Sequence, residues 1–164
     1  MPSSLLQERT HPGPGGQDKV SVWLARASLW GIAATAVFDP YEVSPAWRIG
    51  GAVGFVGGSA LAAWAIKSNR WFSSVVRIQT DRGHLLVSRG PYAGIRHPGY
   101  LGFMMAFTWG CLALNSPLAL AIAAFYCCII IRRIRIEESL LQWELFGYHE
   151  YTNLVRYKLI PFIW

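Results

Sequence analysis

The chain has 164 residues, of which 53% are hydrophobic, 14% aromatic and only 15% charged, with a formal net charge of +6. Soluble domains carry about 25% charged residues, and disordered segments combine low hydrophobicity with high charge, so this composition excludes disorder. A protein this small cannot keep so much apolar surface away from water. We therefore expect one all-α domain embedded in a membrane.

Residues 1–19 are polar and contain the stretch HPGPGGQ, whose prolines and glycines oppose helix propagation. They lack the basic start, apolar middle and small-residue cleavage site of a signal peptide. We predict a flexible cytoplasmic tail over 1–19 and a single membrane domain over 20–164.

Four apolar runs follow this tail and predict a polytopic helical bundle. The first run covers residues 20–38. The second, 46–66, has 21 residues and would form a helix of about 31 Å, close to the ~30 Å hydrocarbon core of a bilayer. Only the tripeptide Asn-Ser-Pro separates the third run, 100–114, from the fourth, 118–131. A turn this short predicts that the last two runs form an antiparallel helical hairpin.

The distribution of basic residues predicts the orientation in the membrane. If all four runs cross, 13 of the 15 Lys and Arg residues lie on the side of the N-terminus, Arg48 lies on the other side, and Arg26 lies within the first run. This split follows the positive-inside rule. We therefore predict a multi-pass membrane protein with both termini in the cytoplasm and one or two C-terminal helices on the cytoplasmic side.

Small residues inside the apolar runs are interpreted as packing residues. Gly50, Gly54 and Gly58 recur every four residues in the second run, and this spacing lets membrane helices approach closely. A phosphate-binding loop would need a strand before it and a helix after it, and this run offers neither. The three cysteines, at 111, 127 and 128, show no metal-ligand spacing, so we expect small buried side chains, no disulfide framework and no metal site.

The residues capable of chemistry concentrate in two cytoplasmic stretches, 67–99 and 132–164. The first contains HLLVSRGPYAGIRHPGYLG, residues 84–102, and the second contains RRIRIEESLLQWELFGYHEY. In a structural interpretation, the first stretch is an interfacial loop whose Tyr side chains anchor it and whose Arg side chains snorkel to the membrane surface. In the same interpretation, Glu137 and Glu138 form ion pairs with Arg133 and Arg135. A functional interpretation is that a tandem carboxylate near His, Arg and Tyr suits a small cationic ligand with a hydroxylated sugar.

Four features follow one another along the chain: the sequence GPYAGIRHPGYLG, a short hairpin, the sequence RIEESLLQWELFG and the sequence VRYKLIPF. This order resembles the isoprenylcysteine carboxyl methyltransferase family and the related membrane phospholipid N-methyltransferases. The resemblance covers about residues 77–164, half of the chain. It implies a membrane methyltransferase that uses S-adenosyl-L-methionine, held on the cytoplasmic side by residues 77–102 and 132–164. The cofactor-binding residues that it implies are His84, Leu85, Leu86, Val87, Tyr92, Arg96, His97, Pro98, Gly99, Tyr100, Glu137 and Glu138.

Several assignments stay open within this resemblance. The family's substrate-side Arg aligns with Ile134, which leaves Arg133 and Arg135 as substrate-side candidates. Tyr148, His149 and Tyr151 receive no role. In the implied chemistry, a carboxylate at Glu138 accepts hydrogen bonds from the ligand. Arg96 or His97 binds the cofactor's carboxylate, and Tyr rings cover its sulfonium cation. No catalytic base is predicted, because a carboxylate acceptor needs none.

The acceptor is expected to be lipophilic and to reside at the membrane. An isoprenylcysteine-type carboxylate is the first expectation, and a phospholipid amine or a small thiol are the alternatives. From other classes, an NADPH-dependent membrane reductase predicts a larger bundle. A non-enzymatic scaffold gives no reason for RHPGY and the Glu pair to occur together. The expected partners are membrane lipids and a lipidated substrate, not nucleic acid, and no motif indicates an oligomeric state.

Overall fold

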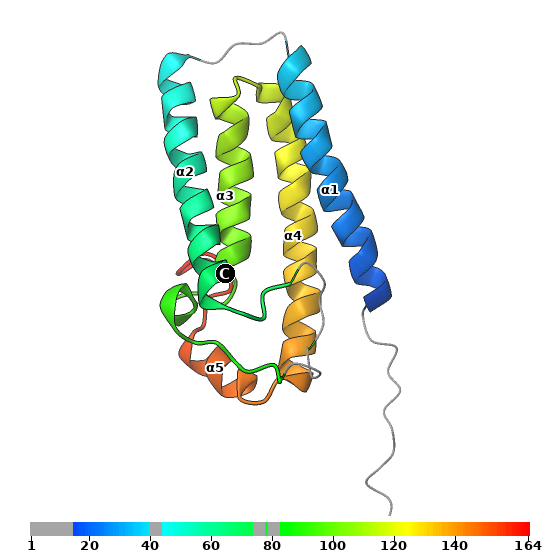
Figure 1. The fold of residues 1–164 in the computed structure, drawn as a ribbon, viewed down its shortest axis with the longest axis vertical. Helices are drawn as coiled ribbons and strands as arrows, with labels where there is room; N and C mark the ends of the chain where they lie inside the picture. Colours follow the sequence, from blue (N-terminus) through cyan, green and yellow to red (C-terminus); the bar gives the residue numbers. More distant parts are fainter. Residues whose placement is uncertain (1–14, 40–43, 74–77, 79–82) are drawn as a thin grey trace, which may run out of the picture.

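The computed structural model of the protein describes residues 15–39, 44–73, 78 and 83–164. These residues form helices and connecting loops, with no strand among them (Figure 1), so the all-α prediction is confirmed. The elements in chain order are α1 (Gly15–Phe38), α2 (Pro45–Ser68), the short 3-10 helix η3 (Gly90–Ala93), α3 (Pro98–Ala113), α4 (Pro117–Glu144) and α5 (Tyr148–Leu154).

Helix α1 begins earlier than the sequence predicts. Residues 15–19 were expected to belong to the flexible tail, but the helix already includes Gly15. Both prolines of the HPGPGGQ stretch, Pro12 and Pro14, precede this helix in the sequence. Proline interrupts a helix only in its interior, so it does not prevent a start at this point. The remainder of the predicted tail, 1–14, lies outside the described residues.

Two of the helices, α2 and α4, are long and apolar enough to cross a membrane. Helix α4 has 28 residues and ends at Glu144 rather than at residue 131, so it continues through the charged stretch that follows the apolar run. Its length of about 42 Å exceeds a bilayer core of ~30 Å, whereas α3, with 16 residues, reaches only about 24 Å. The crossing of all four apolar runs stays a prediction.

Helices α3 and α4 form the predicted antiparallel hairpin. Asn115 in the turn has a φ of 63°, and asparagine tolerates this left-handed conformation better than most residues. Ser116 caps α4 by accepting a hydrogen bond from the backbone of Ala119. The Asp39 carboxylate accepts from the Ser116 hydroxyl at 2.7 Å and from the Leu118 backbone at 2.8 Å. These bonds fasten the end of α1 to the start of α4.

The glycine-rich face of α2 packs directly on α3, as the sequence predicts, but in a shifted register. A Cβ atom on Gly58 would lie 2.5 Å from the backbone nitrogen of Ala106. Gly51 meets the α3 backbone and Gly54 meets the ring of Trp109 in the same way, whereas Gly50 has no such neighbour within 4 Å. The packing residues are therefore 51, 54 and 58 rather than 50, 54 and 58.

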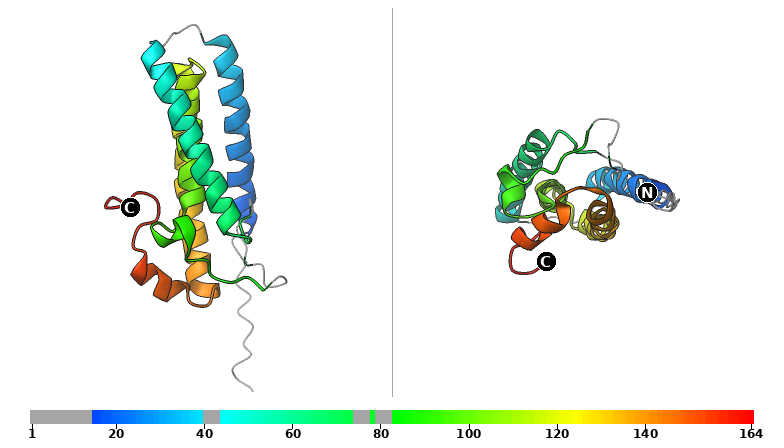
Figure 2. Two further views of the ribbon diagram at one scale, coloured as in Figure 1. Left: turned by 60° about the vertical axis from the view of Figure 1, so that its left-hand side comes forward. Right: turned by 90° about the horizontal axis from the view of Figure 1, so that it is seen from below.

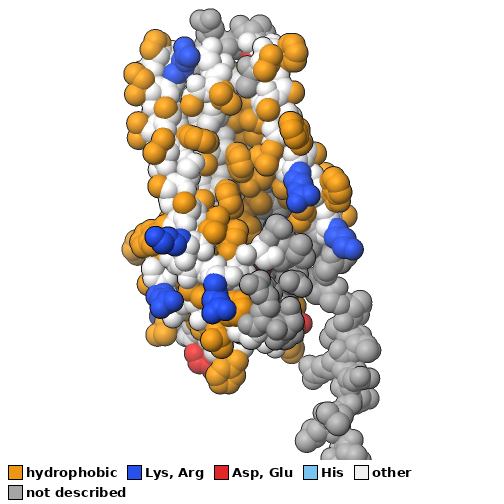
Figure 3. Space-filling model, in the orientation of Figure 1, with side chains coloured by type: hydrophobic (Ala, Val, Ile, Leu, Met, Phe, Trp, Pro, Cys, Tyr) orange, Lys and Arg blue, Asp and Glu red, His pale blue; other side chains and the backbone are white. Residues whose placement is uncertain are grey.

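The helices pair as α1 with α4 and α2 with α3, and α3 and α4 lie next to each other between the outer helices (Figures 1 and 2). Hydrophobic side chains are spread over the visible surface of the upper bundle, and apart from one near the top, the visible Lys and Arg side chains lie toward its middle and lower part (Figure 3). On α1 the ring of Trp30 is 79% exposed. Large exposed apolar side chains on long apolar helices are expected where lipid replaces water.

The prediction of three buried cysteines is correct only in part. Cys111 is buried and Cys127 is half-buried, but Cys128 is exposed on α4. A helix that faces lipid exposes apolar side chains, as Phe125 is exposed on the same helix. An apolar neighbourhood in the sequence therefore does not predict burial inside the protein.

Candidate active site

A cleft opens at the lower end of the bundle, where the loop before α3 faces the lower part of α4 and α5. The empty space in and in front of this cleft amounts to about 760 Å³, a figure that includes space open to solvent. Ten of the twelve predicted cofactor-binding residues line it: His84, Leu85, Leu86, Val87, Tyr92, Arg96, His97, Gly99, Tyr100 and Glu137. The other two, Pro98 and Glu138, do not belong to its wall.

The turn residues of the HPG motif bring the loop to the start of α3. His97 occupies the N-cap position and Pro98 the first turn of α3, where a missing backbone N–H costs nothing. Gly99 lies against Phe72, because a Cβ atom on Gly99 would come within 2.6 Å of that ring. The glycine therefore allows the segment after α2 to form one wall of the cleft.

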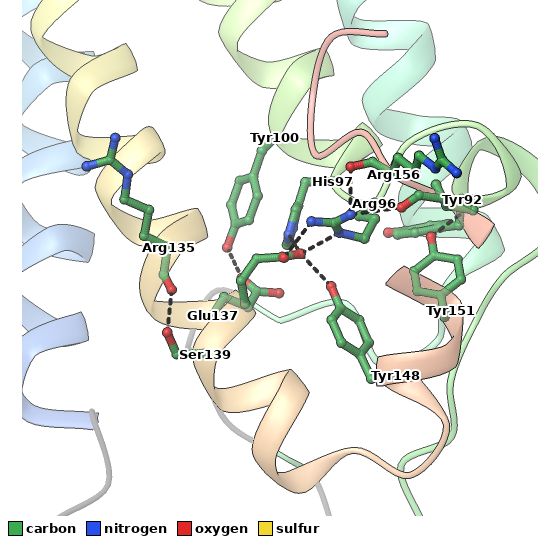
Figure 4. A network of polar contacts seen from close by, with 12 residues as sticks. Tyr92, Arg96, His97, Tyr100, Arg135, Glu137, Ser139, Tyr148, Tyr151 and Arg156 are labelled. Carbon is green, nitrogen blue, oxygen red and sulfur yellow. Dashed lines mark hydrogen bonds and ion pairs between the residues drawn. The ribbon is translucent and has the colours of Figure 1, made fainter. Parts of the chain in front are cut away.

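Glu138 lies at the centre of a buried polar network behind the cleft wall (Figure 4). Its side chain is 5% exposed. Arg96 donates to both carboxylate oxygens, from Nε at 2.9 Å and from Nη2 at 2.7 Å. His97 Nε2 lies 2.8 Å from Oε1, and the Tyr148 hydroxyl donates to Oε1 at 2.6 Å. Such charge-assisted, bidentate contacts are strong and fix the geometry of all four side chains.

This network assigns Glu138 a different partner from the one expected. The structural interpretation of the sequence paired the glutamates with Arg133 and Arg135, and the functional interpretation assigned Glu138 to the ligand. In the structure, Glu138 pairs with Arg96 in the loop. Burial and the charge of Glu138 raise the pKa of Tyr148 well above its ordinary value, so the phenol remains a protonated donor. We interpret Glu138 as a positioning residue that holds Arg96 and His97.

Arg96 also fastens the chain after α5 to the loop. Its Nη1 atom donates to the carbonyl oxygens of Val155, at 2.8 Å, and Arg156, at 2.9 Å. With its two contacts to Glu138, the guanidinium makes four hydrogen bonds within the protein. Arg96 therefore contributes one edge of the cleft mainly as a fixed, charge-balanced support.

A second polar chain presents Glu137 to the cleft. Arg133 Nε donates to the Tyr100 hydroxyl at 2.7 Å, and this hydroxyl donates to Glu137 Oε2 at 2.6 Å. Of the two substrate-side candidates, Arg133 is buried behind Tyr100, and Arg135 is exposed and points away from these residues (Figure 4). Neither of them lines the cleft, whereas Glu137 offers it a carboxylate.

An aromatic and aliphatic wall completes the cleft. The buried ring of Trp71 lies 5.3 Å from the ring of His84, at an interplanar angle of 31°. Burial lowers the pKa of His84, although the charge of Glu137 partly opposes this shift, so the ring is uncharged at neutral pH. Burial likewise raises the pKa of Tyr92 to about 12. This wall therefore offers flat, neutral surfaces that suit a heterocyclic base.

Sequence reasoning missed nine residues of the cleft: Asn69, Trp71, Phe72, Ser73, Leu140, Leu141, Leu145, Tyr148 and Tyr151. The tyrosines carried a usable signal, because positions three apart share one face of a helix. Both are buried on α5, and the intervening His149 is exposed. The Tyr151 hydroxyl donates to the Tyr92 carbonyl at 2.6 Å. The residues after α2 belong to no motif, and packing alone brings them to the cleft.

Comparison with known proteins identifies the family. Residues 51–143 match the sequence model of the isoprenylcysteine carboxyl methyltransferase (ICMT) family. The chain belongs to the ICMT family. The matched region contains α2 from residue 51 onward, the loop before α3, α3 and most of α4, so it carries most of the cleft. The resemblance predicted from the RHPGY motif and the Glu pair is confirmed, and with two membrane-length helices it indicates a membrane protein.

Several curated relatives share this region. The protein-S-isoprenylcysteine O-methyltransferase of Saccharomyces cerevisiae is 40% identical over 97 residues, which cover 56% of this chain and 39% of that protein. The probable protein-S-isoprenylcysteine O-methyltransferase of Oryza sativa subsp. indica is 35% identical over 101 residues, 60% of this chain and 52% of that protein. Protein-S-isoprenylcysteine O-methyltransferase B of Arabidopsis thaliana is 33% identical over 101 residues, with 60% and 50% covered. The chain thus matches about half, or less, of the length of these relatives.

Proposed function

We propose that this chain binds S-adenosyl-L-methionine in the cleft and transfers a methyl group to the carboxylate of a lipophilic, isoprenylcysteine-type substrate. One observation carries the proposal: the family's matching residues His97, Tyr100 and Glu137 converge on a single cleft at the end of two membrane-length helices. The names of the curated relatives favour a carboxylate acceptor over an amine or a thiol.

The chemistry of the cleft fits this cofactor. The carboxylate of Glu137, held by Tyr100, would bind the ammonium group or the ribose hydroxyls. The rings of Tyr92, Tyr100 and Tyr148 line the same space, and aromatic faces attract a sulfonium cation. The wall that contains Trp71 and His84 would cover the adenine. When bound, the cofactor would supply an electrophilic methyl group.

The residues of the chain would act by binding, orientation and exclusion of water. A carboxylate acceptor is already a nucleophile at neutral pH, so its methylation needs no proton transfer to a protein group. The Glu138 network would hold Arg96 and His97 in fixed positions, and alignment of two reactants by such a rigid wall accounts for large rate effects. Arg133 would act indirectly by orienting Tyr100 and Glu137.

We further propose that the bundle crosses the membrane several times and that the cleft faces the cytoplasm, together with both termini. The support is the predominance of basic residues on that side, 13 of 15. In this arrangement the cofactor would enter from the cytoplasm, and a lipophilic acceptor would enter from the membrane beside the helices.

Two measurements test the proposed function. Calorimetry on the purified protein in detergent should show binding of S-adenosylhomocysteine and no binding of NADPH. With methyl-labelled S-adenosylmethionine, label should enter S-farnesylcysteine in a form that base releases as methanol, because only a methyl ester is base-labile. Base-stable label in a phospholipid or a thiol would assign the amine or thiol alternative instead. Binding of NADPH without S-adenosylhomocysteine would overturn the proposal.

A further inference from the structure

The chain after α5 ends in a closed turn over residues 158–164, called the 158–164 turn below. The backbone oxygen of Trp164 accepts hydrogen bonds from the backbone N–H groups of Lys158 at 3.0 Å and Leu159 at 2.9 Å. The Trp164 N–H donates to the Ile160 carbonyl at 3.1 Å. The Lys158 ammonium lies 4.9 Å from the centre of the Trp164 ring. These contacts give the turn a defined shape.

The base of this turn is buried and its tip is exposed. Leu159 is 3% exposed and packs in the core with Tyr100 and Ile134. Phe162 is 89% exposed and Ile163 77% exposed. Phe162 has a φ of 68°, a left-handed conformation that is uncommon for a bulky residue. A rare backbone conformation that displays two large apolar side chains points to a function for the tip.

The 158–164 turn lies at the level where α2 ends and α3 begins. The carbonyl oxygen of Tyr157 accepts from the backbone of Arg96 at 2.9 Å, and that of Lys158 accepts from His97 at 2.8 Å. These two acceptors bond the residues directly before α3. Figures 1 and 2 show this end of the chain beside the lower ends of α2 and α3, on the outside of the bundle. The tip therefore lies near the boundary between the apolar helices and the cleft.

Charge and area indicate what covers the tip. Arg156 is exposed just before the turn, and Lys67 and Arg70 are exposed at the end of α2. Arg156 and Lys158 precede the exposed tip directly along the chain, and cationic side chains next to exposed aromatic and aliphatic residues are typical of segments that bind anionic lipid headgroups. A stable contact with a second copy would need about 800 Å² from each partner, much more than two side chains on a narrow turn provide.

We propose that the 158–164 turn inserts Phe162 and Ile163 into the headgroup–acyl boundary of the membrane that holds the bundle. Arg156 and Lys158 lie at the level of anionic headgroups in this arrangement. Because Arg96 bonds the carbonyls of Val155 and Arg156, the lipid contact holds one wall of the cleft against the membrane surface. This contact goes beyond methyl transfer and does not depend on it.

Depth-dependent quenching of a fluorophore tests this contact. In a Cys127→Ala, Cys128→Ala background, which retains the buried Cys111, the Ile163→Cys variant is labelled with the dye NBD and placed in vesicles of phosphatidylcholine and phosphatidylglycerol. We expect blue-shifted emission and quenching by lipids with a shallow nitroxide at least threefold greater than at the matched Asn153→Cys site on α5. Equal, water-like emission at both sites would overturn the proposal. Phe162→Cys is a second labelling site if the first variant does not fold.

The same samples separate this contact from the proposed function. Binding of S-adenosylhomocysteine is measured on the labelled protein in the same vesicles. Lipid quenching without binding of S-adenosylhomocysteine would support the membrane contact and reject the proposed cofactor. Binding of S-adenosylhomocysteine without lipid quenching would reject only the membrane contact. Blue-shifted emission that lipid nitroxides do not quench, together with crosslinking between copies at residue 163, would overturn the proposal in favour of self-association.

Discussion

Two adjacent glutamates on α4 have different surroundings at the level of single residues. Consecutive residues of a helix point about 100° apart, so Glu138 faces the protein interior and Glu137 faces the cleft. Glu138 accepts hydrogen bonds from Arg96, His97 and Tyr148, whereas Glu137 is held by Tyr100 at one oxygen. Under the proposed function, Glu138 would therefore support the wall of the cleft and Glu137 would bind the ligand.

Substitution of each glutamate by glutamine tests this division. Glu138→Gln should lower the free energy of unfolding by about 3–5 kcal/mol, because it leaves the buried Arg96 without its counter-charge. Glu137→Gln, the matched control, should leave the stability of the unliganded protein nearly unchanged. It should weaken S-adenosylhomocysteine binding by about 1.5–3 kcal/mol, the value of a hydrogen bond to a charged group. Thermal unfolding with and without the ligand measures both effects, and equal losses in the two variants would contradict the assignment.

The lowered pKa of His84 predicts a dependence of stability on pH. Burial, the main cause, disfavours the charged ring in the folded state, so the unfolded chain binds this proton more readily. The contribution of His84 to stability is therefore present above the unfolded pKa of about 6.5 and decreases as the pH falls below it. We expect the melting temperature to fall more between pH 7.5 and 5.5 in the wild type than in His84→Gln. Parallel pH profiles would show that His84 is not the responsible group.

The sequence predicts site residues that lie within one continuous motif better than site residues that come from distant parts of the chain. Residues 84–100 and the Glu pair lie in recognisable motifs, and most of them line the cleft. The ion-pair partner of Glu138 could not be predicted because Arg96 is 42 positions away along the chain, and no local pattern shows which glutamate faces inward. Trp71 was missed for a related reason, since it reaches the cleft only through packing of the segment after α2.

At the scale of elements, the contact between α2 and α3 depends on the absence of side chains at particular positions. Gly spacing in the sequence predicts a close helix pair, but it does not specify the register, because residues 50 and 51 are both glycine. A helix face repeats at alternating intervals of three and four residues, and the observed positions 51, 54 and 58 follow that rule. A strict interval of four drifts around the helix and leads to Gly50.

Alanine substitutions at two glycines of α2 test this register. Gly58→Ala should destabilise the protein by about 1–3 kcal/mol, because the new methyl group would meet the backbone of Ala106 and must separate the helices. Gly50→Ala meets no atom within 4 Å and should gain up to about 1 kcal/mol from the better helix propensity of alanine. Thermal unfolding of both variants in the same detergent provides the comparison. Equal stability of the two variants would place the contact elsewhere.

Helix α4 joins the membrane-length bundle to the cleft in one continuous element. Its apolar run ends at residue 131, but RRIRIEESLLQWE contains neither glycine nor proline and continues the helix to Glu144. Hydropathy thus predicted where the apolar surface ends, not where the helix ends. Glu138 lies seven residues beyond that limit, about 10 Å along the axis, so a rigid helix sets the distance of the cleft from the apolar bundle.

For the whole molecule, the two ends of the bundle differ in chemistry. The end of α1, the start of α2 and the α3–α4 turn lie at one end, and the cleft, α5 and the 158–164 turn lie at the other (Figure 1). On the face shown in Figure 3, most Lys and Arg side chains lie in the half of the molecule toward the cleft. Cationic loops are retained in the cytoplasm during membrane insertion, so this asymmetry favours a cleft that faces the cytoplasm, where the proposed methyl donor would be supplied.

Accessibility labelling in intact cells tests this orientation at both ends. Ser44 is exposed and makes no side-chain cap hydrogen bond at the start of α2, and Glu150 is exposed on α5 at the opposite end. A membrane-impermeant maleimide added outside should modify the Ser44→Cys variant at once, and the Glu150→Cys variant only after the membrane is permeabilised. The unsubstituted chain corrects for reaction at Cys128.

The reverse pattern would place the cleft outside the cell, away from the proposed cofactor, and would contradict the topology and the proposed function together. Labelling of both variants only after permeabilisation would show that the start of α2 does not reach the outside of the membrane. The bundle would then enter the membrane from one side without crossing it.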